Sequence, residues 1–335
     1  VGRLDLRFPL DLLVRDVKAV EPNTNDTLLS LERLKVELRL WKLLKKEVEI
    51  EEISIRNATF DTRDFIDGVV VNGHLGELYL ESHGVVFSPE TARINEFSVK
   101  NTDVSLTLEN MADTDTTTTE PIYWKILLDE IDFENVGFAL KMPQDSLFVR
   151  TMLPKTTLKD GVIDLKEASY YVKSFDMDNA ELAYGPKEEL SLKKIGLQLD
   201  SIYYCGRDIR ANIEEFVFKE RSGLELVSTE GRIASDSVLI QIPKFTMKTT
   251  ASSLDLQTKI GWDVLEMKKT GVLSAKINAE IGKGDVAKIL GGRDTLFLQT
   301  YPNKPFVFRA DAEGDLNRLR LRTLEAGLAK AFELK

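Results

Sequence analysis

The stretch Glu52–Phe60 reads Glu-Ile-Ser-Ile-Arg-Asn-Ala-Thr-Phe, with apolar residues four and two places before an Asn and again three places after it. Three further segments align with it without gaps and share this pattern: Glu96–Val104, Glu130–Phe138 and Ser174–Leu182. Repeats of this kind stack into arrays in which each copy contacts its neighbours. The repeat therefore predicts one array built from equivalent strands.

The alternation of apolar and polar residues changes phase at the Asn. Counted from the Asn, the apolar positions before it lie at even distances and the one after it lies at an odd distance. A flat strand would put the two halves on opposite faces. An extra residue in a bulge, or a corner at an Asn in the left-handed conformation, returns both halves to one face. Each copy is thus expected to be a strand, a kink and a second strand with its large apolar residues on one side. The predicted corner residues are Asn57, Asn101, Asn135 and Asn179.

The Asn residues are 44, 34 and 44 positions apart. A difference of about ten residues is roughly one strand with its turn, so hairpins of variable length between equivalent strands would explain it. Alternation with a period of two residues, as in Leu34–Leu40, indicates half-buried strands elsewhere in the chain. The pairs Asp67-Gly68, Asp160-Gly161 and Ser222-Gly223 predict hairpin turns between such strands.

Helical signals are few. Trp41–Lys46 is expected to form a turn or two of helix, and Asp285–Leu290 a short helix that follows an N-cap Asp and stops at a Gly pair. A competing interpretation makes Leu28–Lys46 one amphipathic helix. The Thr-rich segment Ala112–Pro121 is typical of an exposed loop, and a change of local architecture is expected from about residue 267.

Together these patterns predict a mainly β fold: an elongated repeating array of strands with few short helices, continuous over residues 1–335. The chain begins inside a patterned stretch at Val1, has no initiator Met, and is still patterned at its end. We therefore expect it to be a fragment of a longer protein.

Composition narrows the classes of function. The 335 residues are 43% hydrophobic and 30% charged, which suits a folded chain with a large apolar surface. The net charge is −10, and no Lys/Arg block with interleaved aromatic residues is present, so nucleic acid is not an expected partner. The single cysteine, Cys205, cannot form an intrachain disulfide. No apolar run reaches the 18 or so residues of a membrane-spanning helix.

No catalytic, metal or cofactor motif emerges. The only histidines, His74 and His83, have no Cys or His partner at ligand spacing, and no nucleophile elbow accompanies them. Carboxylates lie on the polar phase of the predicted strands, as expected for a solvated outer face; examples are Asp129, Asp132, Glu134 and Asp176. We therefore expect no enzyme. A β-helical carbohydrate-active enzyme remains an alternative, since strand spacing brings carboxylates to about 5–9 Å by chance.

The opening region carries a family resemblance. Its segments occur in the order of a first strand set, a strand run, a short helix around Leu43-Leu44, and an Ile/Val strand with its Asn; they are Leu6–Val17, Thr27–Leu38, Trp41–Leu44 and Val48–Ile55. This order resembles the amino-terminal part of the TamB family in the AsmA-like superfamily. The pattern from Gly231-Arg232-Ile233 to Ser253-Leu254-Asp255-Leu256 is similar to later repeats of that superfamily.

The resemblance implies a non-enzymatic periplasmic protein of the Gram-negative envelope, anchored in the inner membrane by a helix absent from this sequence. It implies that the strands form an elongated, folded-over (taco-like) repeating β-groove sheet, whose hydrophobic groove holds the acyl chains of phospholipids. It also implies transport between inner and outer membranes that supports outer-membrane biogenesis, and an outer-membrane barrel partner. A structural β-solenoid scaffold, or an assembly factor for outer-membrane proteins, is the alternative. The residues expected to line the groove are Ile53, Ile55, Phe97, Val99, Ile131, Phe133, Phe175 and Met177.

Overall fold

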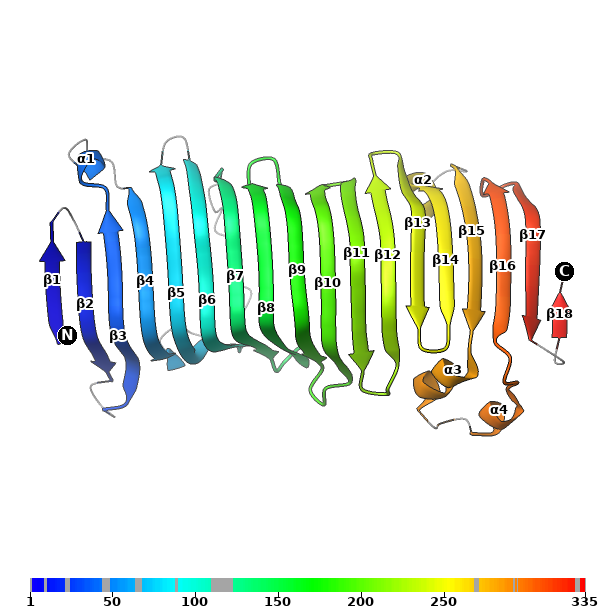
Figure 1. Ribbon diagram of the computed structural model, residues 1–335, viewed down its shortest axis with the longest axis horizontal. Helices are drawn as coiled ribbons and strands as arrows, with labels where there is room; N and C mark the ends of the chain where they lie inside the picture. The colour runs from blue at the N-terminus through cyan, green and yellow to red at the C-terminus, as the bar shows by residue number, and fades with distance from the viewer. Residues whose placement is uncertain are drawn as a thin grey trace. The chain divides into compact units, whose positions relative to one another are not determined.

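The computed structural model describes residues 2–8, 11–21, 25–43, 49–63, 68–87, 90–109, 123–267, 271–291, 293, 295–328 and 332–334. The chain is mainly β with a few short helices, as predicted. It divides into two compact units, Val1–Ser191 and Leu192–Lys335. Within each unit the strands form an open sheet in which each strand pairs with the next along the chain (Figure 1). The Thr-rich segment Ala112–Pro121 lies outside the described residues.

The described residues of the first unit form nine strands and one helical turn, α1 (Leu40–Leu43). All neighbouring strands in it are antiparallel except β6 and β7, which are parallel. The strands are β1 (Arg3–Arg7), β2 (Asp11–Val20), β3 (Thr27–Leu38), β4 (Ile50–Asp61), β5 (Val69–Phe87), β6 (Glu90–Leu108), β7 (Lys125–Met142), β8 (Leu147–Asp164) and β9 (Ser169–Tyr184).

The second unit is antiparallel from β10 onward, and its helices lie between strands in the segment Trp262–Thr300. Its strands are β10 (Leu190–Cys205), β11 (Asp208–Glu220), β12 (Glu225–Ser235), β13 (Leu239–Thr249), β14 (Ser253–Gly261), β15 (Leu273–Ile281), β16 (Phe306–Gly314), β17 (Leu319–Leu328) and β18 (Phe332–Leu334). Its helices are α2 (Trp262–Leu265), α3 (Lys283–Leu290) and α4 (Thr295–Thr300).

All four repeat Asn residues have left-handed backbone conformations. Their φ angles are 47° at Asn57, 49° at Asn101, 55° at Asn135 and 54° at Asn179. The strand register is the same on both sides of each: Arg56 pairs with Glu77 before Asn57, and residues 58 and 75 pair after it. A bulge would set two residues against one. The chain therefore turns a corner at these residues without inserting an extra one.

The corners line up across the sheet. Because the register is unchanged across the corner, each strand from β2 to β9 has one residue at the level of the corner. We call this set of residues the corner line. Its members are Asp16, Glu32, Asn57, Gly76, Asn101, Asn135, Pro154 and Asn179. The strands that run in one direction (β2, β4, β6, β7 and β9) carry the positive φ. Those that run in the other direction carry Glu, Gly or Pro at the corner line.

Two residues of the corner line, Gly76 and Pro154, are suited to their positions at the corner. A Cβ on Gly76 would lie 2.5 Å from the backbone oxygen of Asn101, so only glycine fits there. Pro154 lacks a backbone N–H, yet it lies inside β8, where a proline normally removes a ladder hydrogen bond. The ladder pairing skips the corner line on both sides of Pro154, so this loss is small.

The parallel pair explains the unequal spacing of the repeat. Between Asn57 and Asn101, and between Asn135 and Asn179, a complete return strand intervenes (β5 or β8). Between Asn101 and Asn135 none intervenes, and β6 pairs with β7 in parallel at an offset of 34 residues. The prediction of hairpins between equivalent strands is therefore confirmed for the two 44-residue spacings and wrong for the 34-residue one, which lacks a return strand. The corner residues themselves are neighbours, because Asn135 Nδ2 donates a hydrogen bond to Asn101 Oδ1 at 3.0 Å.

Several local predictions can be compared with the structure. The helical interpretation of Leu28–Lys46 was wrong, since β3 occupies most of that range and, among its described residues, only those of α1 are helical. The hairpin at Ser222-Gly223 is confirmed between β11 and β12. Asp160-Gly161 forms no hairpin, because both residues lie inside β8 and Asp160 has a φ of 51°. The helix at the Gly pair is confirmed as α3, but Gly282 is its N-cap and Asp285 lies in its first turn.

The first prediction concerns the corner line. We expect Asn135→Val to lower the free energy of unfolding by about 1–3 kcal/mol, because a β-branched residue is strained at positive φ. Asn135→Gly should cost less than about 1 kcal/mol, since glycine adopts this conformation freely. Chemical denaturation measures both values, and Glu134→Val is the neighbouring control outside the left-handed region. Equal losses for Val and Gly at position 135 would contradict the corner.

Candidate functional site

Two rows of apolar side chains cross the first unit, and the strand register places them on one face. The first row contains Leu6, Leu12, Val36, Ile53, Leu80, Phe97, Ile131, Leu158 and Phe175. The second contains Leu4, Val14, Leu34, Ile55, Leu78, Val99, Phe133, Thr156 and Met177. Residues directly opposite each other in a sheet share a face, as do residues two apart in a strand. We call this surface the apolar face.

All eight predicted lining residues lie in these rows. Within the apolar face, Phe97 and Phe133 pack edge to face, with ring centroids 6.2 Å apart. Sequence reasoning missed the members on the return strands, among them Leu78, Leu80 and Leu158. Their signal was the alternation of Leu78-Tyr79-Leu80, which lies outside the Asn repeat.

The apolar face continues past the corner line. Arg56 and Asn57 are both exposed, whereas Ala58 is buried, so the polar phase shifts by one residue at the corner. The same shift occurs in β9, where Asp178 and Asn179 are exposed and Ala180 is buried. A further row follows beyond the corner line: Leu29, Phe60, Gly73, Val104, Phe138, Thr151 and Leu182. The corner thus keeps the large apolar side chains of both halves on one side.

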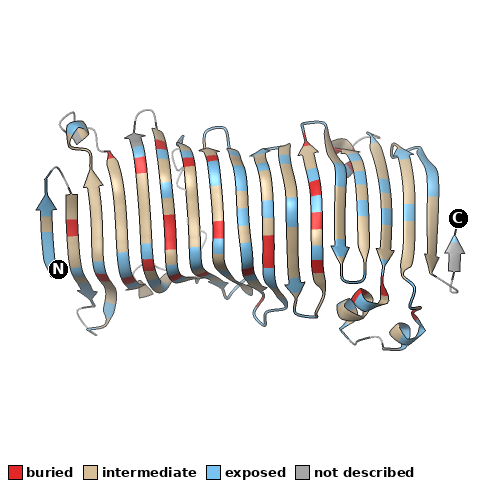
Figure 2. Ribbon diagram, in the orientation of Figure 1, coloured by how far each residue is buried: buried red, intermediate tan, exposed pale blue. Residues whose placement is uncertain are grey.

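Most members of the rows are half-buried. Val99 is buried, but Ile53, Phe133 and Phe175 retain intermediate exposure, and Figure 2 shows the same for most strand positions. A second sheet packed at about 10 Å would bury such side chains fully. The partial exposure therefore indicates that protein does not close over these residues in the part of the chain that the structure describes.

Thr156 interrupts the second row. It is buried between Phe133 and Met177 in register, and its hydroxyl has no hydrogen-bond partner among the described residues. An unsatisfied buried hydroxyl costs about 1–3 kcal/mol. The next residue, Thr157, lies on the opposite face and donates to Asp132 Oδ1 at 2.7 Å. Thr156 and Thr157 therefore lie on opposite faces of the sheet, and only the hydroxyl of Thr157 has a hydrogen-bond partner among the described residues.

The opposite face carries charged side chains, including a run of five glutamates in direct register on β3 to β7. They are Glu37, Glu52, Glu81, Glu96 and Glu130. Lys35 bridges the first two with Nζ–O distances of 3.0 and 2.8 Å, and Lys159 pairs with Glu130 at 2.9 Å. Burial, the hydrogen bond to Glu81 and the nearby carboxylates together raise the pKa of Tyr79 to about 12.

The predicted outer-face carboxylates fit this division. Asp132 pairs with Ser98 and Thr157 in register and so lies on the face opposite Phe133. Glu134 and Asp176 are exposed, and Asp129 forms an ion pair with Arg93 at 3.2 Å. The solvated positions of Glu134 and Asp176 and the ion pair of Asp129 give these carboxylates structural roles.

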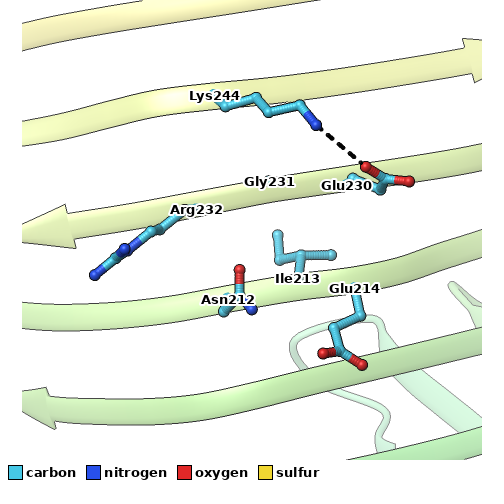
Figure 3. A pocket seen from close by; sticks show the side chains of 7 residues that line it. All are labelled: Asn212, Ile213, Glu214, Glu230, Gly231, Arg232 and Lys244. Carbon is cyan, nitrogen blue, oxygen red and sulfur yellow. Dashed lines mark hydrogen bonds and ion pairs between the residues drawn. The ribbon is translucent and has the colours of Figure 1, made fainter.

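The second unit has an apolar row of its own: Leu199, Ile213, Gly231, Phe245, Leu256, Ile277, Ala310 and Leu324. A Cβ on Gly231 would lie 2.6 Å from the Phe245 ring, so that ring occupies the space above the glycine. Figure 3 shows a hollow beside this glycine, lined by Asn212, Ile213, Glu214, Glu230, Gly231, Arg232 and Lys244. Glu230 and Lys244 form an ion pair there at 3.4 Å. The hollow offers no nucleophile beside a base.

The histidines are exposed, and His83 Nδ1 lies 2.6 Å from Asn95 Oδ1. Among the described residues, no group of three His, Cys, Asp or Glu side chains is placed to hold a metal ion. Of the helices that the structure describes, none combines the length and apolar character needed to cross a membrane. A scan against protein-family models matches none, and no curated protein sequence matches the chain. The resemblance to the TamB family therefore stays a prediction.

The second prediction tests the two faces through adjacent threonines. Thr156→Val should raise the free energy of unfolding by about 1 kcal/mol, because it removes an unsatisfied hydroxyl from an apolar row at nearly constant volume. Thr157→Val should lower it by about 0.5–1.5 kcal/mol, because it breaks the hydrogen bond to Asp132. Urea denaturation of both variants gives the sign of each change. A loss of stability in Thr156→Val would mean that its hydroxyl is satisfied and the facing is wrong.

The third prediction concerns the glutamate run. Glu96 lies between Glu81 and Glu130, and like charges directly opposite each other destabilise a sheet. Glu96→Lys should therefore raise the free energy of unfolding by about 0.2–1 kcal/mol at low salt. Glu181→Lys, at an exposed position opposite Met152, is the matched charge change and should have little effect. Thermal melts at low and high salt compare them; a gain that persists unchanged in high salt would argue against electrostatic relief.

Proposed function

We propose that the apolar face of the first unit binds and shields the acyl chains of phospholipids, and that the protein is a non-enzymatic carrier of lipid. The observation that carries this proposal is the pair of apolar rows that cross nine strands and remain half-exposed. Exposed apolar area on this scale is unusual in a soluble protein unless something covers it. An acyl chain has no polar group to satisfy, so a continuous apolar surface suffices to hold it.

The dimensions support this proposal. Nine strands spaced at about 4.8 Å extend over roughly 38 Å, whereas the tails of one leaflet occupy about 15 Å, half of a bilayer's hydrocarbon core. The apolar face is thus longer than a single tail, as a path along which lipid moves would need to be. The two rows contain no charged residue and Thr156 is their only polar member, so they would contact tails and leave the headgroup to water.

The proposed setting is the one that the family resemblance implies: the periplasm, with transport between inner and outer membranes and a barrel partner in the outer membrane. The apolar face supports lipid binding, whereas the location and the barrel partner rest on the family resemblance alone. A structural scaffold, or an assembly factor for outer-membrane proteins, would use the same strands. What separates these functions is whether lipid occupies the apolar face.

The fourth prediction separates a lipid path from a scaffold. Phe133→Arg, Phe175→Arg and the double variant should stay folded, since a long cation can extend out of an open surface into water. Their uptake of a fluorescent phospholipid, and the lipid that copurifies with them by native mass spectrometry, should fall, most in the double variant. Ser174→Arg and Asp176→Arg flank Phe175 on the opposite face and are the controls.

Two outcomes would overturn the lipid path. Unfolded Phe133→Arg and Phe175→Arg proteins would show that protein buries these rings, because an unpaired buried charge costs several kcal/mol. Folded variants with undiminished lipid would show that the apolar face is not the binding surface. Controls that lose lipid equally would point to a general charge effect.

A further inference from the structure

Helices α3 and α4 of the second unit expose large apolar side chains, and α3 buries a charged one. The charged Asp285 of α3 faces the protein with 2% of its surface exposed, whereas Ile289 on the same helix is 68% exposed. In α4, Leu296 is 73% and Phe297 46% exposed. Surface helices of soluble proteins normally present the opposite arrangement, with apolar residues inward. The exposed apolar side chains therefore need a reason beyond folding.

Polar contacts hold α3 in this orientation. The Asp285 carboxylate accepts hydrogen bonds from Thr249 and from Ser252 Oγ, the latter at 2.6 Å, in the turn between β13 and β14. Burial alone would raise the pKa of Asp285, but these hydrogen bonds and the nearby Lys288 ammonium hold that pKa below its usual range. Lys288 Nζ also donates to Thr250 Oγ1 at 2.9 Å. These contacts hold α3 against the turn between β13 and β14, while Ile289, one helical turn beyond Asp285, stays exposed near the end of the helix.

Further contacts tie α4 to the same end of the sheet. Tyr301 is buried, its hydroxyl donates to the Ile281 carbonyl at 3.0 Å, and its carbonyl accepts from Lys283 Nζ at 2.8 Å. The Phe297 ring packs edge to face on Tyr301. Both helices lie beyond the same ends of the strands in Figure 1. Ile289, Leu296 and Phe297 are thus presented on two anchored helices, and we call these three residues the helical tip.

The charge around the helical tip favours an anionic partner. Residues 283–304 hold four basic and two acidic side chains, a net charge of +2, whereas the whole chain carries −10. Arg293, between the helices, and Lys304, after α4, are exposed. Apolar side chains flanked by cations are the arrangement by which interfacial helices bind anionic lipid surfaces. We propose that the helical tip docks the second unit on the headgroup region of a membrane that contains anionic phospholipid.

The test is sedimentation of the full chain with vesicles of equal parts phosphatidylglycerol and phosphatidylcholine, and with vesicles of phosphatidylcholine alone. We expect binding to the anionic vesicles that weakens as ionic strength rises toward about 1 M, where the screening length is about 3 Å. The double variant Ile289→Glu/Leu296→Glu should bind at least tenfold more weakly. Arg293→Glu/Lys304→Glu should lose the preference for anionic vesicles.

The matched control is Val238→Glu/Leu316→Glu. These residues are 66% and 52% exposed and lie in turns at the opposite ends of the strands of the same unit, so they add the same charge away from the helical tip. This control should bind vesicles like the unaltered chain. Circular dichroism melts establish that every variant is folded, which is expected because the altered side chains are exposed.

Docking by the helical tip is overturned if the unaltered chain does not sediment with anionic vesicles, or if Ile289→Glu/Leu296→Glu binds as tightly as the unaltered chain. An equal loss in the control would also overturn it. Vesicle docking by the helical tip and lipid uptake by the apolar face can be tested separately. Phe133→Arg/Phe175→Arg should take up less lipid yet sediment normally with vesicles, and Ile289→Glu/Leu296→Glu should show the reverse.

Discussion

The first unit depends on one constraint: its hydrogen-bond ladders must keep their register on both sides of a bend that crosses every strand from β2 to β9. One strand cannot bend alone, because its neighbours would lose their pairing. The bend therefore requires a suitable residue at the same level of each strand. Asn accepts the left-handed conformation in β4, β6, β7 and β9, while Gly76 and Pro154 occupy the level where ladder pairing is absent.

The parallel pair also meets this constraint. A corner of one kind is found in the strands that run in one direction, and β6 and β7 both carry it. Their parallel pairing puts Asn101 beside Asn135 and keeps the apolar rows continuous from Phe97 to Ile131 and from Val99 to Phe133. An intervening return strand, like those on either side, would have served equally. The apolar face is thus indifferent to strand direction, because opposite residues share a face in both kinds of ladder.

A sheet with a half-exposed apolar face gains less from hydrophobic burial than a two-layer domain of the same length. Its ladders and cross-strand pairs carry more of the stability, and a bound ligand that covers the apolar face would add to it by mass action. The face opposite the apolar face lowers the stability of the sheet, because its glutamate run places like charges in register. Helices α3 and α4 likewise expose the apolar side chains of the helical tip, while the carboxylate of Asp285 is buried.

The sequence by itself determined the period of the strands, the four Asn positions and the side of each repeat strand that holds Ile53 or Phe133, because a period of two residues and its phase shift are local properties of the chain. It did not determine strand direction, so the parallel pair and the origin of the 34-residue spacing were missed. Asp160-Gly161 was misread because a positive φ inside a strand and a hairpin turn favour the same residues. Only the tertiary structure decided which residues complete the apolar rows, where Thr156 lies, and that Asp285 is buried while Ile289 is exposed. Those outcomes depend on the register between strands distant in sequence and on the contacts of α3 with another turn, which no local pattern encodes.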